Sequence, residues 1–339
     1  MKYILVDSLN MFMRAKHVGG RGQSIDMKIG MAMHITLNSI RKAYRDFGGD
    51  HVVFCLEGRS WRKDFYEPYK KNRKVVADQR SVREQEDDEL YFEAYNDFID
   101  FLSEKTNVTM LRNREAEADD MIAIWTQEHP DDEHIIVSTD SDFYQLIAPN
   151  VTQYNGTTDE LVSLEGFKSV KTGEWVIDKK TKDVKTPIDP EFALFEKCVR
   201  GDSSDNIFSA YPGARKKGSK NKTGIMEAFE DRNTGGFNYN NFMLQRWTDH
   251  NEEEHRVRDD FMRNKILIDL TEQPDEIRQK CIESINEALQ KPRATNVGFA
   301  FMKFCAKWDM QRLADDATEF ATMLNKGAMK DESKIESHN

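Results

Sequence analysis

Four short apolar runs in the first half of the chain constrain its fold most strongly. They are KYILV, HVVFCL, NVTML and HIIVST, at residues 2–6, 51–56, 107–111 and 134–139. Uninterrupted apolar runs of this length are typical of strands buried on both faces of a sheet. Helical patterns lie between and after them, at 27–47, 89–105, 119–129 and, briefly, in FYQLI. This alternation predicts an α/β fold with a mostly parallel central sheet flanked by helices.

The second half of the chain has a different pattern. Residues 160–187 alternate around Thr172-Gly173, which predicts an exposed hairpin excursion. Beyond Asp189-Pro190 the sequence is almost wholly helical. We therefore expect a first domain over 1–188, a helical domain over 189–327 and a polar, disordered tail over 328–339.

Composition excludes several classes of protein. Charged residues make up 32% of the 339 residues, as in a soluble globular protein, and no apolar run is long enough for a membrane span. The four cysteines contain no C-x-x-C pair, which argues against a zinc knuckle and favours a reducing cytoplasm. Phosphate-binding glycine motifs are absent, and the faint calcium loop at 231–242 has Phe242 where glutamate belongs.

Acidic residues follow every predicted strand. In a parallel sheet the carboxyl ends of the strands open on one edge, where ligands bind, so we expect these side chains to converge. A further acidic pair, three residues apart in GDSSDNI, is spaced to face the same point from one helical turn. The candidates are Asp7, Glu57, Glu117, Asp119, Asp120, Asp140, Asp142, Asp202 and Asp205.

Two interpretations of these acids are open. A single Asp after a strand is more often a helix N-cap, and Asp142 and either Asp119 or Asp120 precede helices. Acids at all four strand ends favour a metal site instead. Carboxylates without converging His or Cys suit Mg²⁺, for which Mn²⁺ can substitute, and two such ions can promote phosphoryl displacement.

Positive charge is concentrated in two stretches of an otherwise acidic chain, whose net charge is −11. The first, GRSWRKDFYEPYKKNRK at 58–74, interleaves basic and aromatic residues. In it, Lys70 and Arg73 are spaced to share a phosphate, and Tyr69 is a candidate for stacking on a base. The second, ARKKGSKNK at 214–222, is a predicted loop offering backbone N–H and ammonium groups to a phosphate backbone. The DNA-binding candidates are Arg62, Lys63, Tyr69, Lys71, Lys216, Lys217, Lys220 and Lys222.

Taken in order, five segments resemble the 5′ nuclease family, which includes flap endonucleases, 5′–3′ exonuclease domains and phage 5′ nucleases. They are VDSLNMFMRA, WRKDFYEPYKKNR, EAEADD, STDSDFYQL and GDSSDNI. The resemblance spans about residues 1–325 and is greatest to the phage ribonuclease H type.

The resemblance implies a Mg²⁺-dependent 5′–3′ exonuclease and flap endonuclease with ribonuclease H activity. It implies that the nine acidic candidates hold two ions and that Arg14, Lys70 and Arg73 handle phosphate. Residues from about 70 to 105 would form a helical arch in a PIN-like nuclease core, and the second domain would bind DNA with a helix-turn-helix-like fold. Substrates would be DNA with 5′ flaps or nicks and RNA–DNA hybrids, in lagging-strand replication within a phage-infected bacterium. A monomer is expected, with a single-stranded-DNA-binding protein as a partner.

Two positions depart from the family pattern. Glu57 stands where the family has Asp, so it either reaches the metal by its longer side chain or contributes little. The family's glycine-rich PGIGPKTA is here YPGARKKGSKNKTGIMEAF, which favours binding by lysine charge over a monovalent-cation clamp. Two other functions stay open: a toxin-like single-stranded-RNA endonuclease, and a structure-specific DNA-binding protein that has lost catalysis.

Overall fold

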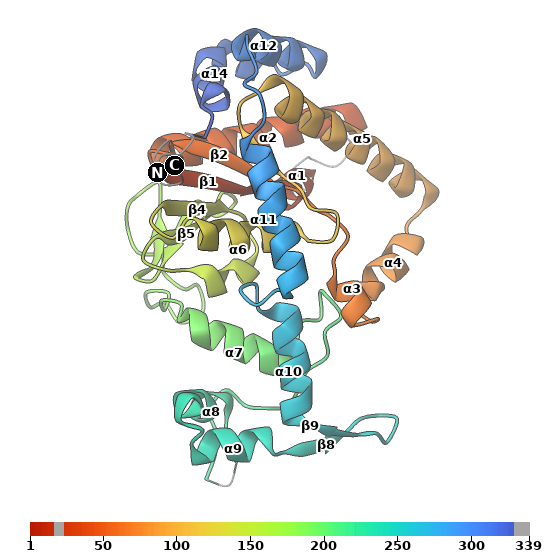
Figure 1. The fold of residues 1–339 in the computed structure, drawn as a ribbon, viewed down its shortest axis with the longest axis vertical. Coiled ribbons are helices and arrows are strands. Elements are labelled where there is room, and N and C mark those ends of the chain that lie inside the picture. Colours follow the sequence, from red (N-terminus) through yellow and green to blue (C-terminus); the bar gives the residue numbers. More distant parts are fainter. Residues whose placement is uncertain (17–23, 221, 329–339) are drawn as a thin grey trace, which may run out of the picture.

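A computed structural model describes residues 1–16, 24–220 and 222–328 (Figure 1). Nearly all of the predicted tail, from residue 329 onward, lies outside the described residues. None of the described helices is both long and apolar enough to cross a membrane.

A seven-stranded sheet forms the centre of the molecule, in the order β3-β2-β1-β4-β5-β6-β7. The first five of these strands pair in parallel and the last two pair antiparallel. The strands are β1 (Lys2–Asp7), β2 (His51–Cys55), β3 (Thr109–Leu111), β4 (Glu133–Val137), β5 (Val151–Asn155), β6 (Glu160–Ser163) and β7 (Gly166–Ser169). The prediction of a mostly parallel sheet flanked by helices is confirmed.

Helices cover both faces because alternate side chains of the buried strands point to opposite sides. On β1, Ile4 and Val6 join one core, and Tyr3 and Leu5 join the other. The first core is completed by α1 (Ser8–Lys16), α2 (Ile25–Asp46), α5 (Val82–Lys105), α12 (Val297–Lys307), α13 (Gln311–Asp315) and α14 (Ala317–Asn325). The second is completed by α6 (Ala118–Glu128), the 3-10 helix η1 (Ser141–Leu146) and α11 (Asp275–Leu289).

A third core lies beside the sheet, in the lower part of Figure 1. It is built mainly from α7 (Pro190–Arg200), α8 (Ile225–Glu230), α9 (Phe237–Met243) and α10 (Val257–Ile268). The 3-10 helix η2 (Arg232–Thr234) and the hairpin of β8 (Arg246–Thr248) and β9 (Glu254–Arg256) lie in the same region of the chain, and Trp247 of β8 packs against this core. The domain division at 188/189 stays a prediction. Packing shows that α7–α10 form this separate core, whereas α11–α14 return to the sheet.

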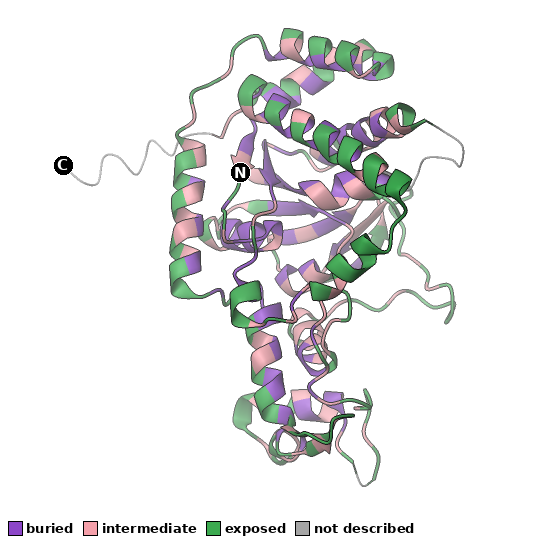
Figure 2. Ribbon diagram, turned by 90° about the vertical axis from the view of Figure 1, so that its right-hand side faces the viewer, coloured by how far each residue is buried: buried purple, intermediate pink, exposed green. Residues whose placement is uncertain are grey.

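Two connections differ from the sequence-based expectation. The chain after 160 does not only make an exposed hairpin, because β6 and β7 first extend the sheet; the remainder up to 187 is largely exposed. Between β2 and α5 lie α3 (Arg62–Phe65) and α4 (Lys71–Asp78), and α4 has no buried residue. α4 and the adjoining start of α5 lie at the right-hand edge of the molecule in Figure 1, and Figure 2, which faces this side, shows them as largely exposed; we call them the exposed projection.

Gly58 fixes the loop that leaves β2. A Cβ atom at this position would lie 1.9 Å from the carbonyl oxygen of Asn113 and 2.5 Å from that of Ala116. We expect Gly58→Ala to lower the free energy of unfolding by about 2–3 kcal/mol, because overpacking against backbone forces the two loops apart. Gly30→Ala is the control: its Cβ would lie 3.4 Å from its nearest neighbour inside α2, so it should shift stability by at most about 1 kcal/mol. Urea unfolding of both variants measures the difference, and equal midpoints would contradict this account.

Candidate metal and nucleic-acid site

The carboxyl edge of the sheet gathers acidic side chains from distant parts of the chain. Asp7 ends β1 and is buried, and its Oδ2 accepts a hydrogen bond of 2.8 Å from Ser138 Oγ beyond β4. Glu57 follows β2 and accepts the backbone N–H of Ala118, at the start of α6, over 3.4 Å. Strand ends and helix starts therefore meet here, as the parallel topology requires.

Four carboxylates at this edge form no ion pair with any described basic residue. We call Asp7, Glu57, Asp119 and Asp140 the first carboxylate group. Burial and the charge of Glu57 raise the pKa of Asp7 to about 7, and burial with Asp7 and Glu57 raises that of Asp119 well above its usual value. Such mutual repulsion is what a bound divalent cation would relieve, and a donor set of carboxylate oxygens alone fits Mg²⁺ or Mn²⁺.

Four further carboxylates carry basic partners. We call Glu117, Asp142, Asp202 and Asp205 the second carboxylate group. The ammonium of Lys70 pairs with Glu117 and lies 3.5 Å from Asp205, whereas Lys197 pairs with Asp142 and lies 2.8 Å from Asp202. Burial disfavours the charged form of Glu117, but Lys70 and Arg62 outweigh burial and lower its pKa to about 2. Likewise Lys197 overcomes burial to lower the pKa of Asp202 to about 2.

The two groups adjoin each other. A cavity of about 20 Å³ is lined by Asp119 of the first group and by all four members of the second. Its polar lining also includes Lys197 and Tyr69. The structure thus brings eight of the nine acidic candidates to one place.

Asp120, the ninth acidic candidate, points elsewhere. It is fully buried, and its two oxygens accept hydrogen bonds of 2.8 Å each from the guanidinium of Arg62. Its Oδ2 also accepts the N–H of Glu117 over 3.1 Å. The prediction that Asp120 is a metal ligand therefore does not fit the geometry; it is a positioning residue. The helix-cap interpretation applies instead to Asp140, whose Oδ1 accepts the N–H of Asp142, and to Glu117, the N-cap of α6.

Two of the residues predicted to contact DNA, Arg62 and Tyr69, are buried, which contradicts the prediction. Arg62 is 1% exposed and Tyr69 is 4% exposed. Arg62 holds Asp120, and the Tyr69 hydroxyl donates to Glu117 at 2.8 Å or to Asp205 at 3.0 Å. Neither side chain presents a face to a nucleic acid. The interleaved basic and aromatic residues predict a nucleic-acid-binding surface, but Arg62 and Tyr69 instead form part of the inner wall of the site.

The other basic candidates lie nearer the surface. Arg73 is exposed and pairs with Asp205 at 2.7 Å, beside the largely buried Lys70. The remaining exposed candidates are Arg14 on α1, Lys63 on α3, Lys71 on α4, and Lys216, Lys217, Lys220 and Lys222 in the 214–222 loop. The site therefore has a basic residue at its rim and further lysines along the third core.

A carboxylate of the protein itself binds backbone N–H groups in and next to the 214–222 loop. Glu227 accepts the N–H groups of Gly218 and Gly224 at 3.0 Å each. Glycine is required at both positions, since a Cβ on Gly218 would lie 2.7 Å from the Gly224 nitrogen. The N–H groups of Gly218 and Gly224 are therefore not free to bind phosphate, whereas phosphate binding by the rest of the loop and its lysines stays a prediction.

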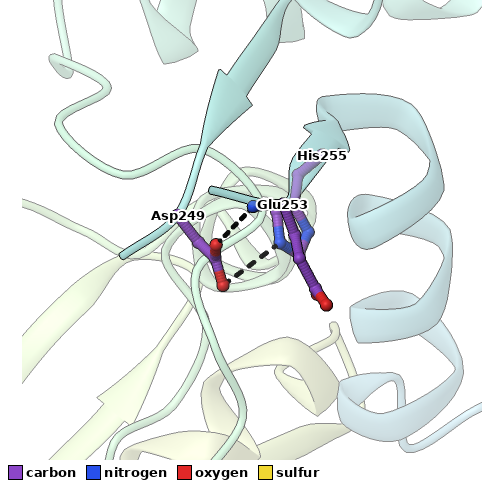
Figure 3. Close-up of side chains that lie close together, drawn as sticks. All are labelled: Asp249, Glu253 and His255. Carbon is purple, nitrogen blue, oxygen red and sulfur yellow. Dashed lines mark hydrogen bonds and ion pairs between the residues drawn. The ribbon is translucent and has the colours of Figure 1, made fainter. Parts of the chain in front are cut away.

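A separate cluster lies at the β8–β9 hairpin (Figure 3). Among the described residues, Asp249, Glu253 and His255 are the only three such side chains whose donor atoms all lie within 4.8 Å of one another. Asp249 accepts the N–H of Glu253 at 2.9 Å and so closes the hairpin turn, and His255 donates through Nδ1 to Asp260 at 3.1 Å. These contacts account for the cluster as turn structure.

Sequence reasoning missed Lys197 and Ser138. Lys197 lies five residues before Asp202 in the last turn of α7, and its other partner, Asp142, is distant in sequence. Ser138 lies just before the predicted acidic pair that follows β4. Its hydroxyl donates to Asp7, and a hydroxyl at that position was the only feature by which the sequence could have indicated this role.

The fold and this carboxylate edge define the class of protein, an α/β protein with a carboxylate-lined candidate metal site at one edge of a mostly parallel sheet. The sequence matches the family model of the 5′-3′ exonuclease N-terminal, resolvase-like domain over residues 2–175. The chain therefore belongs to the 5′-3′ exonuclease family, as the ordered motifs predicted.

Two relatives and two solved structures are similar to this chain, the structures in fold alone. The chain is 27% identical over 312 residues to a ribonuclease H of Enterobacteria phage T4, covering 87% of this chain and 88% of the relative. It is 26% identical over 235 residues to a 5′-3′ exonuclease of Mycoplasmopsis pulmonis, covering 68% of each. The fold resembles that of the T5 D15 protein co-crystallised with metal ions, with a TM-score of 0.55 and 20% identity over 95% of this chain and 100% of that one. A T5 D15 flap endonuclease complex with DNA and metal ions gives 0.56 at 19% identity, over the same shares of the two chains.

The Arg62–Asp120 pair should contribute heavily to stability. Arg62→Ala leaves a fully buried carboxylate without its partner, so we expect a loss of about 3–5 kcal/mol in the free energy of unfolding. Combining Arg62→Met with Asp120→Leu should recover much of this loss, because no unpaired charge remains buried. Arg59→Ala, which breaks an exposed pair with Asp64, is the control and should change little. Chemical unfolding of the four proteins measures these effects; a loss no larger for Arg62→Ala than for Arg59→Ala would show that the pair does not hold the site.

Proposed function

We propose that this chain is a Mg²⁺-dependent 5′–3′ exonuclease and flap endonuclease with ribonuclease H activity. The observation that carries the proposal is the first carboxylate group, four acids crowded at the sheet edge with no basic partner among the described residues. A relative named ribonuclease H that aligns over most of both chains supports the activity on RNA. A neighbouring fold solved with DNA and metal ions supports the substrate and the cofactor.

In this proposal each residue has a defined task. The first carboxylate group, with the second beside it, would hold two divalent ions, for which Mn²⁺ can substitute; bound there, they supply an activated water and charge neutralisation for phosphodiester hydrolysis. Arg73 at the rim, with Lys70, would orient the scissile phosphate by charge. Asp120 and Arg62 keep the start of α6 in place, and Ser138 orients Asp7.

The surroundings fit a substrate with a 5′ end. The exposed projection of α4 and α5 would form the arch for a 5′ flap, and the lysines of the 214–222 loop would contact the duplex part of DNA with flaps or nicks and of RNA–DNA hybrids. We propose that the enzyme acts as a monomer in the cytoplasm of a phage-infected bacterium, removing RNA primers and 5′ flaps from lagging-strand fragments. A single-stranded-DNA-binding protein would bind at the helical carboxyl-terminal region.

Removing one charge from the first carboxylate group should abolish turnover and spare binding. We expect Asp119→Asn to reduce cleavage of a 5′-labelled flap substrate in Mg²⁺ by ~100-fold or more, since it weakens ion binding. Binding to the same flap in EDTA should be unchanged or tighter, because a negative charge near the phosphates is gone. Asp183→Asn, on the exposed hairpin, is the matched control and should be fully active. Undiminished cleavage by Asp119→Asn, or cleavage by the natural chain in EDTA, would refute the proposed mechanism.

The lysines of the 214–222 loop should contribute by charge alone. We expect Lys216→Ala with Lys217→Ala to weaken duplex binding at low salt by about tenfold and to reduce the slope of log affinity against log salt by about 2. The same double change at Lys179 and Lys180, exposed on the hairpin after β7, is the control. Fluorescence anisotropy at several salt concentrations measures both slopes. Equal slopes in the two double variants would remove this loop from the binding surface.

A further inference from the structure

Lys197 joins two carboxylates that come from different parts of the chain. It lies in the last turn of α7, and its ammonium pairs with Asp142 of η1 and, at 2.8 Å, with Asp202 in the loop after α7. The side chain is only 23% exposed, so this contact is an internal one. A single positive charge thus bridges two acids that otherwise repel each other.

The space around this ammonium is small. The cavity that Lys197 lines together with Asp142 and Asp202 has a volume of about 20 Å³, room for about one water molecule. Mg²⁺ bound by carboxylates usually keeps several of its own waters. The ammonium and a hydrated divalent ion therefore cannot both lie between these two carboxylates.

The first carboxylate group provides the contrast. None of its members has an ion-pair partner in the described part of the chain, so an ion binding there displaces no side chain. An ion binding between Asp142 and Asp202 must displace Lys197, which costs the lysine its two charged partners. The two carboxylate groups therefore differ in whether a divalent ion must displace a lysine in order to bind.

We propose that Lys197 is the built-in counter-ion of the second carboxylate group and competes with the second divalent ion for Asp142 and Asp202. The inference rests on the proposed two-ion nuclease function. The first group loads directly, and the second loads when Lys197 gives up its carboxylates. A phosphate of the bound nucleic acid offers the flexible lysine a replacement partner, so substrate binding favours the second ion.

The test measures ion binding rather than cleavage. Mn²⁺ is titrated calorimetrically into the full chain without DNA, with paramagnetic resonance counting the bound ions. We expect the natural chain to bind a second ion at least about tenfold more weakly than the first, and Lys197→Met to raise the second affinity by about tenfold, leaving the first unchanged. Lys307→Met, which removes an exposed lysine paired with Asp97 of α5, is the control and should resemble the natural chain.

Each result has a distinct meaning. If the chain binds two ions and Lys197→Met leaves the affinity for the second ion unchanged or lowers it, the inference is overturned but the proposed function is not. If the chain binds no Mn²⁺ at all, both the proposed function and the inference are overturned. If Lys197→Met does not fold, the natural chain still provides a test: acetylation of Lys197 by an amine-reactive reagent, followed by mass spectrometry. We expect Mn²⁺ at concentrations that fill the second site to increase Lys197 labelling several-fold relative to the exposed Lys307. Unchanged or reduced labelling would overturn the inference.

Discussion

The buried guanidinium of Arg62 is the contact on which the site depends. It donates to both oxygens of Asp120, lies 3.3 Å from Glu117 and donates through Nε to the carbonyl of Leu267 at 2.7 Å. These partners come from the start of α6 and the end of α10, while Arg62 itself follows the loop that carries Glu57. One side chain therefore fixes the sheet edge, the acidic helix start and the third core relative to one another.

This contact also explains why some carboxylates are neutralised and others are not. Asp120 and Glu117 share the positive charge of Arg62, and Glu117 receives Lys70 as well. The positive charges of Arg62 and Lys70 reduce the repulsion between Glu117 at the start of α6 and the acids of the 202–205 loop. In the described part of the chain no cation forms an ion pair with Asp7 or Asp119. Burial and the charge of Glu57 raise the pKa of Asp7, and burial with the charges of Asp7 and Glu57 raises that of Asp119 despite the opposing charge of Lys70. This difference in basic partners is a property of the protein's own side chains, and it gives the two carboxylate groups different roles.

Sequence predicted the parts of the fold that local pattern determines. The first four strands were found because they are apolar throughout, whereas β5, VTQYN, was missed because Thr152 and Gln153 interrupt its apolar character. The gathering of carboxylates followed from topology, since parallel strands end at one edge. Partners distant in sequence could not be predicted: nothing near Arg62 indicates Asp120, and nothing near Lys197 indicates Asp142. The amphipathic pattern of α11 and α12 likewise predicts helices without saying that they pack on the sheet.

The exposed projection is not independent of the site. Lys70, at the start of α4, has a left-handed backbone with φ of 55°, a conformation that costs a lysine about 1 kcal/mol. Its N–H donates to the carbonyl of Asp205 at 2.8 Å, and Asn206 donates from its side chain to the carbonyl of Pro68 at 2.7 Å. The same short segment thus anchors α4 and positions Asp205 of the second carboxylate group. The hydrogen bonds that hold the start of α4 therefore also hold Asp205, so the exposed projection and the second carboxylate group share one anchor.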